Sequence, residues 1–329
     1  MRKYLLTKNK NFYKANMHCH SIYSDGVLTV EELKKRYKEQ GYSIIAFSDH
    51  EHLIDNSHLN DKDFLAITSC ELSIKEDENL STLKKLDMKV CHLNLYSKDP
   101  HNVDTPCYNS VYDHFTKNSK DIIKVPQCDY KRVYGHEGVS EIIKMANEQG
   151  FLVSYNHPNW SLENARDYLG YEGLWAVEVY NYGADVEYCY SDTSYVFDDF
   201  LKDNVKIACV SGDDNHREDH CFGGYTMINA EELSYDSIMD ALINHNFYAS
   251  WGPEISELYI EDDYIYITVK GASKVILKTG IRRGESQEVE NENKETTLKF
   301  KFYNGDKFVR FEVIDNKGRK ALTNAIYQN

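Results

Sequence analysis

Two histidines one residue apart, His18 and His20, follow an apolar stretch near the N-terminus. Because successive side chains of a strand point to opposite faces, the two imidazoles of such a pair point to the same side. Two imidazoles facing one point can bind a metal ion, although an isolated pair is about as often two unrelated histidines. Asp25, in Ser24-Asp25-Gly26, follows closely and adds a carboxylate.

Further apolar runs end in the same residue types. These runs are Phe47-Ser48-Asp49-His50, Thr68-Ser69-Cys70-Glu71, Val90-Cys91-His92, Tyr155-Asn156-His157 and Val210-Ser211-Gly212-Asp213-Asp214-Asn215-His216. The strands of a parallel α/β barrel present their C-terminal ends to one face of the fold. We therefore expect these side chains to converge, although they lie far apart in the sequence. The number of such ends, rather than any single motif, predicts a metal centre.

The elements that must position these residues follow an α/β pattern. Short apolar runs alternate with amphipathic stretches over the first three quarters of the chain, as in a parallel sheet with crossover helices. Thr29 and Glu32 form a capping box for a helix that ends at Gly41, and residues 43–47 then form a strand. The same signals predict helices at about 137–149 and 234–245 and a strand over 151–155. An α/β barrel or a doubly wound sheet is implied.

Two regions depart from this pattern. The segment 97–136 is polar, contains three prolines and lacks sustained periodicity, so we expect an excursion or a lid. After residue 252, apolar and polar residues alternate, as in 264–269, 297–302 and 308–313, which predicts antiparallel strands with one buried face. We therefore divide the chain into a metal-binding domain over 1–251 and a small β-sandwich domain over 252–329.

The composition limits the classes of function. A formal charge of −15 disfavours a protein that follows long DNA or RNA with a basic surface. No apolar run approaches the roughly 18 residues that span a bilayer, and the first residues lack the apolar core of a secretory signal. The eight cysteines show no CxxC spacing and are expected to be free thiols. We expect a cytoplasmic protein; its oligomeric state stays open.

The order of these motifs resembles the PHP (polymerase and histidinol phosphatase) superfamily. The resemblance lies in the HxH with its following Ser-Asp-Gly, the Asp-His, the lone Glu, two lone histidines and a final Asp-x-His. Ser154-Tyr155-Asn156-His157-Pro158, Val177-Glu178-Val179-Tyr180-Asn181 and Phe247-Tyr248-Ala249-Ser250-Trp251-Gly252-Pro253 further resemble a branch of carbaryl-hydrolase-like proteins with a C-terminal β domain. An HxH also opens amidohydrolase sequences, but their carboxylated lysine is not evident here.

The resemblance covers about residues 16–329 and implies a distorted (βα)7-type barrel followed by a small all-β sandwich-like domain. It also implies two or three divalent ions. One would be bound by His18, His20 and Asp214, a second by His92 and His157 with Glu71 bridging the two, and a third by Asp25, His50 and His216. Six imidazoles with three carboxylates suit Zn, Mn or Fe better than Mg or Ca. Asp49 and Asp213 are expected to orient ligands rather than to bind metal.

Together these features predict a metal-dependent hydrolase that uses a metal-bound hydroxide as nucleophile. A phosphatase or phosphodiesterase acting on a small phosphorylated or other anionic substrate is the first choice, since the sequence has neither a GxSxG motif nor a P-loop. Arg217 and Arg166 are candidates for phosphate contacts, although each alone is more simply a solvated arginine. Two alternatives stay open: an amide, carbamate or ester hydrolase on the same metals, and a metal-stabilised binding module without turnover.

Overall fold

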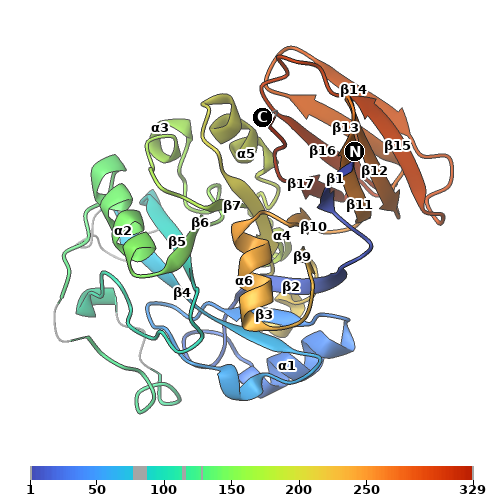
Figure 1. Cartoon of the computed structure of the whole chain (residues 1–329). Coiled ribbons are helices and arrows are strands. Elements are labelled where there is room, and N and C mark those ends of the chain that lie inside the picture. The colour runs from blue at the N-terminus through green and yellow to red at the C-terminus, as the bar shows by residue number, and fades with distance from the viewer. Residues whose placement is uncertain (1, 77–86, 113–115, 127–128, 328–329) are drawn as a thin grey trace.

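The computed structural model describes residues 2–76, 87–112, 116–126 and 129–327, which form two sheets and their covering helices (Figure 1). The larger sheet has 13 strands in the order β14-β13-β16-β17-β10-β9-β2-β3-β4-β5-β6-β7-β8. The smaller sheet has four strands in the order β1-β11-β12-β15.

Seven strands in sequence order form the half of the large sheet that carries the histidines. They are β2 (Asn11–Cys19), β3 (Ile44–Phe47), β4 (Leu65–Lys75), β5 (Val90–Ser97), β6 (Phe151–Tyr155), β7 (Ala176–Asn181) and β8 (Ala208–Gly212). Strands β2 to β4 run parallel, as do β6 to β8, whereas β5 is antiparallel to both of its neighbours. A parallel bridge between Cys19 and Asn215 joins the end of β2 to the loop after β8. The first and last of these strands therefore meet.

The predicted (βα)7 barrel is not confirmed. The sheet is mixed because β5 is antiparallel, and the described residues hold few helices between its strands. Every residue of β5 and nearly every residue of β4 is buried. An antiparallel pair that is buried on both faces has the same continuous apolar pattern as parallel strands, so the sequence alone does not reveal its direction.

The described residues hold six helices. They are α1 (Val30–Glu39), α2 (His136–Glu148), α3 (Ala165–Tyr168), α4 (Tyr182–Val186), α5 (Ser194–Lys202) and α6 (Tyr235–Ile243), with 3-10 turns η1 (Ser57–Leu59), η3 (Ser110–Tyr112) and η4 (Glu218–His220). Three of the six, α1, α2 and α6, begin and end close to where the sequence predicts them. The capping box of Thr29 and Glu32 is present at α1. The predictions of helices at 29–41, 137–149 and 234–245 and of strands at 43–47 and 151–155 are confirmed.

Two helices cover the β5–β7 part of the sheet. Ile142 and Ile143 of α2 and Phe197 and Phe200 of α5 belong to one buried apolar cluster with side chains of these strands. Figure 1 shows α6 on the sheet beside β2 and β9. Burial of the apolar faces of these helices stabilises the strands whose ends carry the histidines.

The C-terminal strands form two sheets that pack on one another. They are β9 (Tyr225–Ala230), β10 (Phe247–Ser250), β11 (Glu254–Glu261), β12 (Tyr264–Lys270), β13 (Lys274–Thr279), β14 (Gly284–Glu288), β15 (Thr296–Lys301), β16 (Val309–Ile314) and β17 (Lys320–Thr323). Ile267 of β12 and Phe311 of β16 are both fully buried in the shared core. The three strands predicted from alternation correspond to β12, β15 and β16 and are confirmed.

The two parts of the chain are joined at both ends. The first strand, β1 (Arg2–Leu6), pairs with β11, and β10 pairs with β17, so one sheet runs through both parts. Figure 1 shows the N-terminus among the C-terminal strands. The domain boundary between residues 251 and 252 stays a prediction.

The segment predicted to be a lid packs against the body of the protein. Residues 113–115 and 127–128, with His114 among them, lie outside the described residues. Of the rest, Cys107, Tyr108 and Tyr112 are buried, as is Arg132. None of the described residues of this segment lines the cavity over the histidine cluster.

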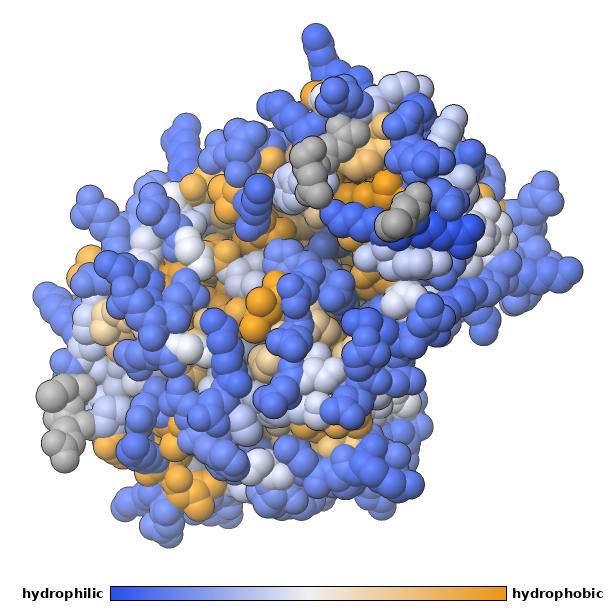
Figure 2. Space-filling view, in the orientation of Figure 1, coloured by the Kyte–Doolittle hydropathy of each residue, from blue (hydrophilic) through white to orange (hydrophobic). Residues whose placement is uncertain are grey.

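Hydrophilic side chains cover most of the face shown in Figure 2, with hydrophobic side chains in small groups between them. Within the described ranges, no helix is both long enough and apolar enough to cross a membrane.

Candidate metal centre

The HxH pair lies where β2 ends. His18 is the last but one residue of β2 and His20 follows the strand, and their Nε2 atoms are 3.2 Å apart. Gly212, at the end of β8, lies against His18, since a Cβ at this glycine would be 2.7 Å from the Cβ of His18. The missing side chain lets the two strand ends approach, which brings the loop with Asp214 to the HxH pair.

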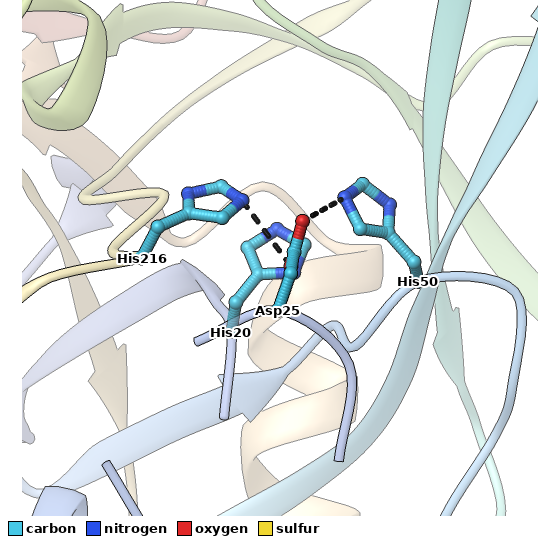
Figure 3. A group of neighbouring side chains, drawn as sticks. All are labelled: His20, Asp25, His50 and His216. Atoms are coloured by element: carbon cyan, nitrogen blue, oxygen red, sulfur yellow. Dashed lines mark ion pairs between the residues drawn. The ribbon is translucent and has the colours of Figure 1, made fainter. Parts of the chain in front are cut away.

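The structure brings all nine predicted ligands together. Three sets have their donor atoms within 4.8 Å of one another, namely His20, Asp25, His50 and His216; His18, His20, Glu71 and Asp214; and Glu71, His92 and His157. In Figure 3 the carboxylate of Asp25 lies between the rings of His50 and His216. Its oxygens are 3.4 Å from Nε2 of each ring.

Glu71 is the centre of the cluster. Its Oε1 is 3.0 Å from His157 Nε2 and 3.1 Å from His92 Nδ1. Its Oε2 faces the other side, 3.2 Å from His50 Nδ1 and 3.4 Å from His20 Nε2. The two oxygens of one buried carboxylate thus face different groups of imidazoles, as a bridging ligand requires.

Glu71 and His92 reach this place by a different route from the predicted one. Glu71 is the seventh residue of the 11-residue strand β4, and His92 is the third residue of β5. Because β5 runs antiparallel, its beginning lies where the other strands end. Glu71 and His92 do lie together, as predicted. The prediction that His92 lies at the C-terminal end of a parallel strand was wrong, because β5 is antiparallel.

Two ligand candidates have left-handed backbone. Asp214 has a φ of 50° and His157 a φ of 24°, a region that costs about 1–3 kcal/mol for residues other than glycine. The Asp214 N–H donates to the carbonyl of His18 at 2.8 Å, which holds the loop in this shape. Such strain is typical of functional sites, where the surrounding structure determines the conformation.

Glu178 was not among the residues predicted to act at the site. This buried residue of β7 has its Oε1 3.0 Å from His18 Nδ1, and its Oε2 accepts the His157 N–H at 3.0 Å. A carboxylate on one ring nitrogen directs the other toward a metal. A lone glutamate between the apolar residues Val177 and Val179 was the available signal.

The two aspartates expected to orient ligands have different roles. Asp213 is fully buried and accepts hydrogen bonds from Tyr37 Oη at 2.6 Å and from the backbone N–H groups of residues 222–224. Asp49 accepts hydrogen bonds from the N–H and hydroxyl groups of Ser21 and Ser24. Asp49 therefore holds the turn that leads to Asp25, and its contact with a ligand imidazole stays a prediction.

The carboxylates favour positive charge at the site. Burial lowers the pKa of His18, but the charges of Asp214, Glu71 and Glu178 outweigh it and raise this pKa well above its ordinary value. Burial also lowers the pKa of His20, but the carboxylates of Asp214 and Glu71 outweigh it and raise this pKa to about 10. Burial raises the pKa of Asp213 to about 6, against the hydrogen bonds it accepts.

Divalent cations fit this donor set. Asp214 Oδ1 accepts no hydrogen bond from the described residues, although Nε2 of His20 and Nε2 of His18 are 3.0 and 3.2 Å away. A shielded carboxylate oxygen without a donor is costly, and a cation held by the same ring nitrogens would satisfy it. Imidazoles mixed with carboxylates suit Zn, Mn or Fe. The role of the nine residues as ligands stays a proposal.

The cluster opens into a cavity of about 340 Å³. Trp160, Glu187 and His220 line it together with seven of the candidate ligands. Arg166 and Arg217 do not line it: the guanidinium of Arg217 pairs with Glu187 and Asp219, and Arg166 is exposed. No role was predicted for Trp160, although it follows His157 by only three residues.

A family model described as "PHP domain" matches residues 16–207. The predicted resemblance to this family is confirmed, whereas the carbaryl-hydrolase-like branch stays a prediction. The comparison with curated proteins gives no match.

Solved structures with a similar arrangement are distant in sequence. A two-domain protein from Bacteroides vulgatus, described as containing a predicted PHP-like metal-dependent phosphoesterase, is 15% identical with a TM-score of 0.47, covering 98% of this chain and 97% of its own. A protein from Bifidobacterium adolescentis, described as a metal-dependent phosphoesterase, is 16% identical with a TM-score of 0.39, over 70% of this chain and 96% of its own. An amidohydrolase from Chromobacterium violaceum with bound sulfate is 12% identical with a TM-score of 0.41, over 71% of this chain and 96% of its own.

Proposed function

The chain belongs to the PHP domain family, and from this premise we propose that it is a metal-dependent phosphoesterase acting on a small anionic substrate. One observation carries the proposal: three groups of donor atoms, linked through Glu71 and His20, converge beside one cavity. Nine residues from distant parts of the sequence supply these groups. A purely structural role would not require so many buried imidazoles around shared carboxylates.

Divalent ions, when bound at such a cluster, supply Lewis acidity and lower the pKa of bound water. Two or three divalent ions outweigh the charge of the three ligand carboxylates, so a loaded site attracts anions although the chain is acidic. No arginine among the described residues lines the cavity. We therefore assign the recognition of a phosphoryl group to the cluster itself.

His220 is the chain's own candidate for a contact with substrate. It lines the cavity and is 2% exposed, and its ring nitrogens have no hydrogen-bond partner among the described residues. Its nearest carboxylate oxygen, Glu187 Oε1, is 3.7 Å from Nε2. A buried imidazole in this state is stabilised by a ligand oxygen that enters the cavity, which suits a residue that positions substrate.

Paired assays test the proposal. Purified protein is analysed for Zn, Mn and Fe by mass spectrometry, loaded with each metal, and given p-nitrophenyl phosphate, bis-p-nitrophenyl phosphate, a p-nitrophenyl ester and a p-nitrophenyl carbamate. We expect metal-dependent hydrolysis of a phosphoester. Turnover of the carbonyl substrates alone would replace the proposal by the carbamate, amide or ester hydrolase, and binding of anions without any turnover would favour a binding module.

Replacement of the central carboxylate tests the metal centre directly. Glu71→Gln is expected to lower bound metal and abolish turnover together, because one carboxylate faces both groups of imidazoles. Metal content and initial rates are measured on the same preparations. Glu148→Gln, the same change at an exposed position of α2, is the control and should alter neither quantity. Unchanged metal content in Glu71→Gln would contradict the bridging role.

A further inference from the structure

A second hollow lies beside the metal cavity and shares a wall with it. Its volume is about 370 Å³, and Trp160 lines both spaces. The remaining wall residues include Leu162, Tyr188 and Tyr190. We call this hollow the Trp160 groove. A molecule that is bound at the cluster and extends past Trp160 enters this groove.

Trp160 is fixed against two of the ligand candidates. The centre of its ring system is 5.0 Å from that of His157, at an interplanar angle of 75°, and 5.3 Å from that of His92. These distances are typical of attractive aromatic contacts. The indole therefore stands beside the imidazoles at one edge of the cluster, while 44% of the residue stays exposed.

The described residues that line the groove are mostly apolar or aromatic. None of these described residues is charged, in contrast to those that line the cavity over the cluster. Tyr188 is 93% exposed, Tyr190 84% and Leu162 47%. Large apolar side chains that are exposed together, rather than singly, mark a surface that binds something.

The backbone that carries these side chains has an uncommon conformation. Leu162, Tyr188 and Tyr190 have φ values of 58°, 60° and 52°, in the left-handed region that bulky residues rarely adopt. Asn159 donates to the carbonyl of Tyr190 at 2.9 Å, and Tyr195 donates to the side chain of Asn159. The backbone at Tyr190 is thus held by contacts within the chain.

We propose that the Trp160 groove binds an aromatic or other flat, uncharged ring of the substrate while its anionic group lies at the cluster. This proposal rests on the proposed function and narrows its substrate class to ring-bearing phosphoesters. Because Trp160 lines both spaces, they lie next to each other, which favours a part of the substrate over a separate partner. The charge distribution agrees, because the anion-attracting cluster and the uncharged aromatic wall lie on either side of one indole.

Two phosphonates that are not hydrolysed distinguish the contribution of the ring to binding from that of the anionic group. Phenylphosphonate and methylphosphonate are titrated into metal-loaded protein by calorimetry, and tryptophan fluorescence is followed. We expect phenylphosphonate to bind about tenfold more tightly, which corresponds to about 1.4 kcal/mol. It should also change the emission, since Trp160 is half-exposed.

Variants of the groove test where the phenyl ring of phenylphosphonate binds. Tyr188→Asn combined with Tyr190→Asn removes two aromatic side chains that line the groove but not the cavity over the cluster, and asparagine tolerates a left-handed backbone. We expect this variant to reduce the preference for phenylphosphonate to about threefold or less, with methylphosphonate affinity and metal content unchanged. Trp160→Leu should also abolish the fluorescence change. Tyr303→Ala, at an exposed tyrosine of the C-terminal strands, is the control.

Each outcome decides a different point. Equal affinity of the two phosphonates in the wild-type protein would overturn the groove proposal and leave the phosphoesterase proposal standing. A preference that survives both groove variants would also overturn it, because the ring would then bind elsewhere. If neither phosphonate binds, both proposals fail. A wild-type dimer, seen by sedimentation, that the tyrosine variant converts to monomer would assign the groove to a second copy of the chain.

Discussion

Glu178 shows how one side chain outside the nine candidate ligands can control the cluster. Its Oε1 lies on Nδ1 of His18, so the other ring nitrogen, Nε2, faces Glu71 and Asp214. Its second oxygen accepts hydrogen bonds from the backbone of His157 and the side chain of Asn181. One carboxylate therefore orients two ligand candidates from different strands.

Glu178→Gln is expected to reduce metal affinity about 10–100-fold without unfolding the protein. The glutamine NH2 group would replace one of the two oxygens that accept hydrogen bonds from His18, His157 and Asn181. Competition with a chelator of known affinity measures the change, and circular dichroism checks the fold. Glu172→Gln, at an exposed position before β7, is the control. Wild-type affinity in Glu178→Gln would show that the negative charge beside His18 Nδ1 is not needed for metal binding.

Among the elements, the segment 97–136 is tied to the body of the protein by a buried ion pair, among other contacts. Arg132 Nη2 is 2.7 Å from Glu51 Oε2, and its Nη1 donates to the carbonyl of Ser73 at 2.8 Å. Glu51 also accepts the Ser73 N–H, and the Ser73 hydroxyl is 2.9 Å from His92 Nε2. The segment is therefore tied to β4 next to the ligand candidate His92, which explains why it packs against the body of the protein.

Arg132→Met is expected to destabilise the protein by about 3–5 kcal/mol, because it leaves Glu51 charged and buried without its partner. Denaturant unfolding measures the loss. Adding Glu51→Gln should recover a large part of it, since the unpaired charge is then removed. The exposed Lys131→Met is the control. A double variant no more stable than Arg132→Met would rule out the buried charge as the cause.

The two parts of the molecule are joined by a charged network around Arg310, which is fully buried. Its guanidinium contacts Asp198 of α5 at 2.5 Å and Glu312 of β16 at 2.7 Å. Lys278 of β13 contacts the same two carboxylates. Asp198 is thus one of the points at which the histidine-bearing part holds the C-terminal sheet.

Asp198→Asn is expected to cost about 3 kcal/mol or more, because Arg310 then keeps a buried charge with one carboxylate fewer. Thermal unfolding should show a lower midpoint, and protease sensitivity should increase at the junction. Asp203→Asn, an exposed change just after α5, serves as the control. An unchanged midpoint would mean that strand pairing alone holds the two parts together.

The same network predicts a dependence of stability on pH. Burial opposes ionisation of Glu312, but the charges of Arg310 and Lys278 outweigh it, so its pKa lies below the ordinary value. Such a group stabilises the fold above its unfolded pKa, and this contribution is lost as the pH falls through its folded pKa. Glu312→Gln should therefore lower stability at pH 7 and flatten its decline in acid. Denaturant titrations from pH 7 to pH 3 measure this, with exposed Glu290→Gln as the control. A decline as steep as in wild type would contradict it.

The sequence by itself determined the elements and the candidate ligands. Caps, glycine stops and apolar periodicity are local properties, so α1, α2, α6 and most strands could be located from them. The types of residue that follow each apolar run are equally local, and all nine of those singled out lie in the cluster.

Only the tertiary structure decided how these parts are joined. The direction of β5 and the pairing of β1 with β11 depend on partners distant in the chain, and a buried strand shows the same apolar pattern in either direction. Glu178 and Trp160 gain their roles from neighbours on other strands, so spacing could not reveal them. For the same reason Arg166 and Arg217 looked suitable as phosphate contacts until their positions outside the cavity were known. Such contacts form only when the chain folds, because they join residues that no local pattern relates.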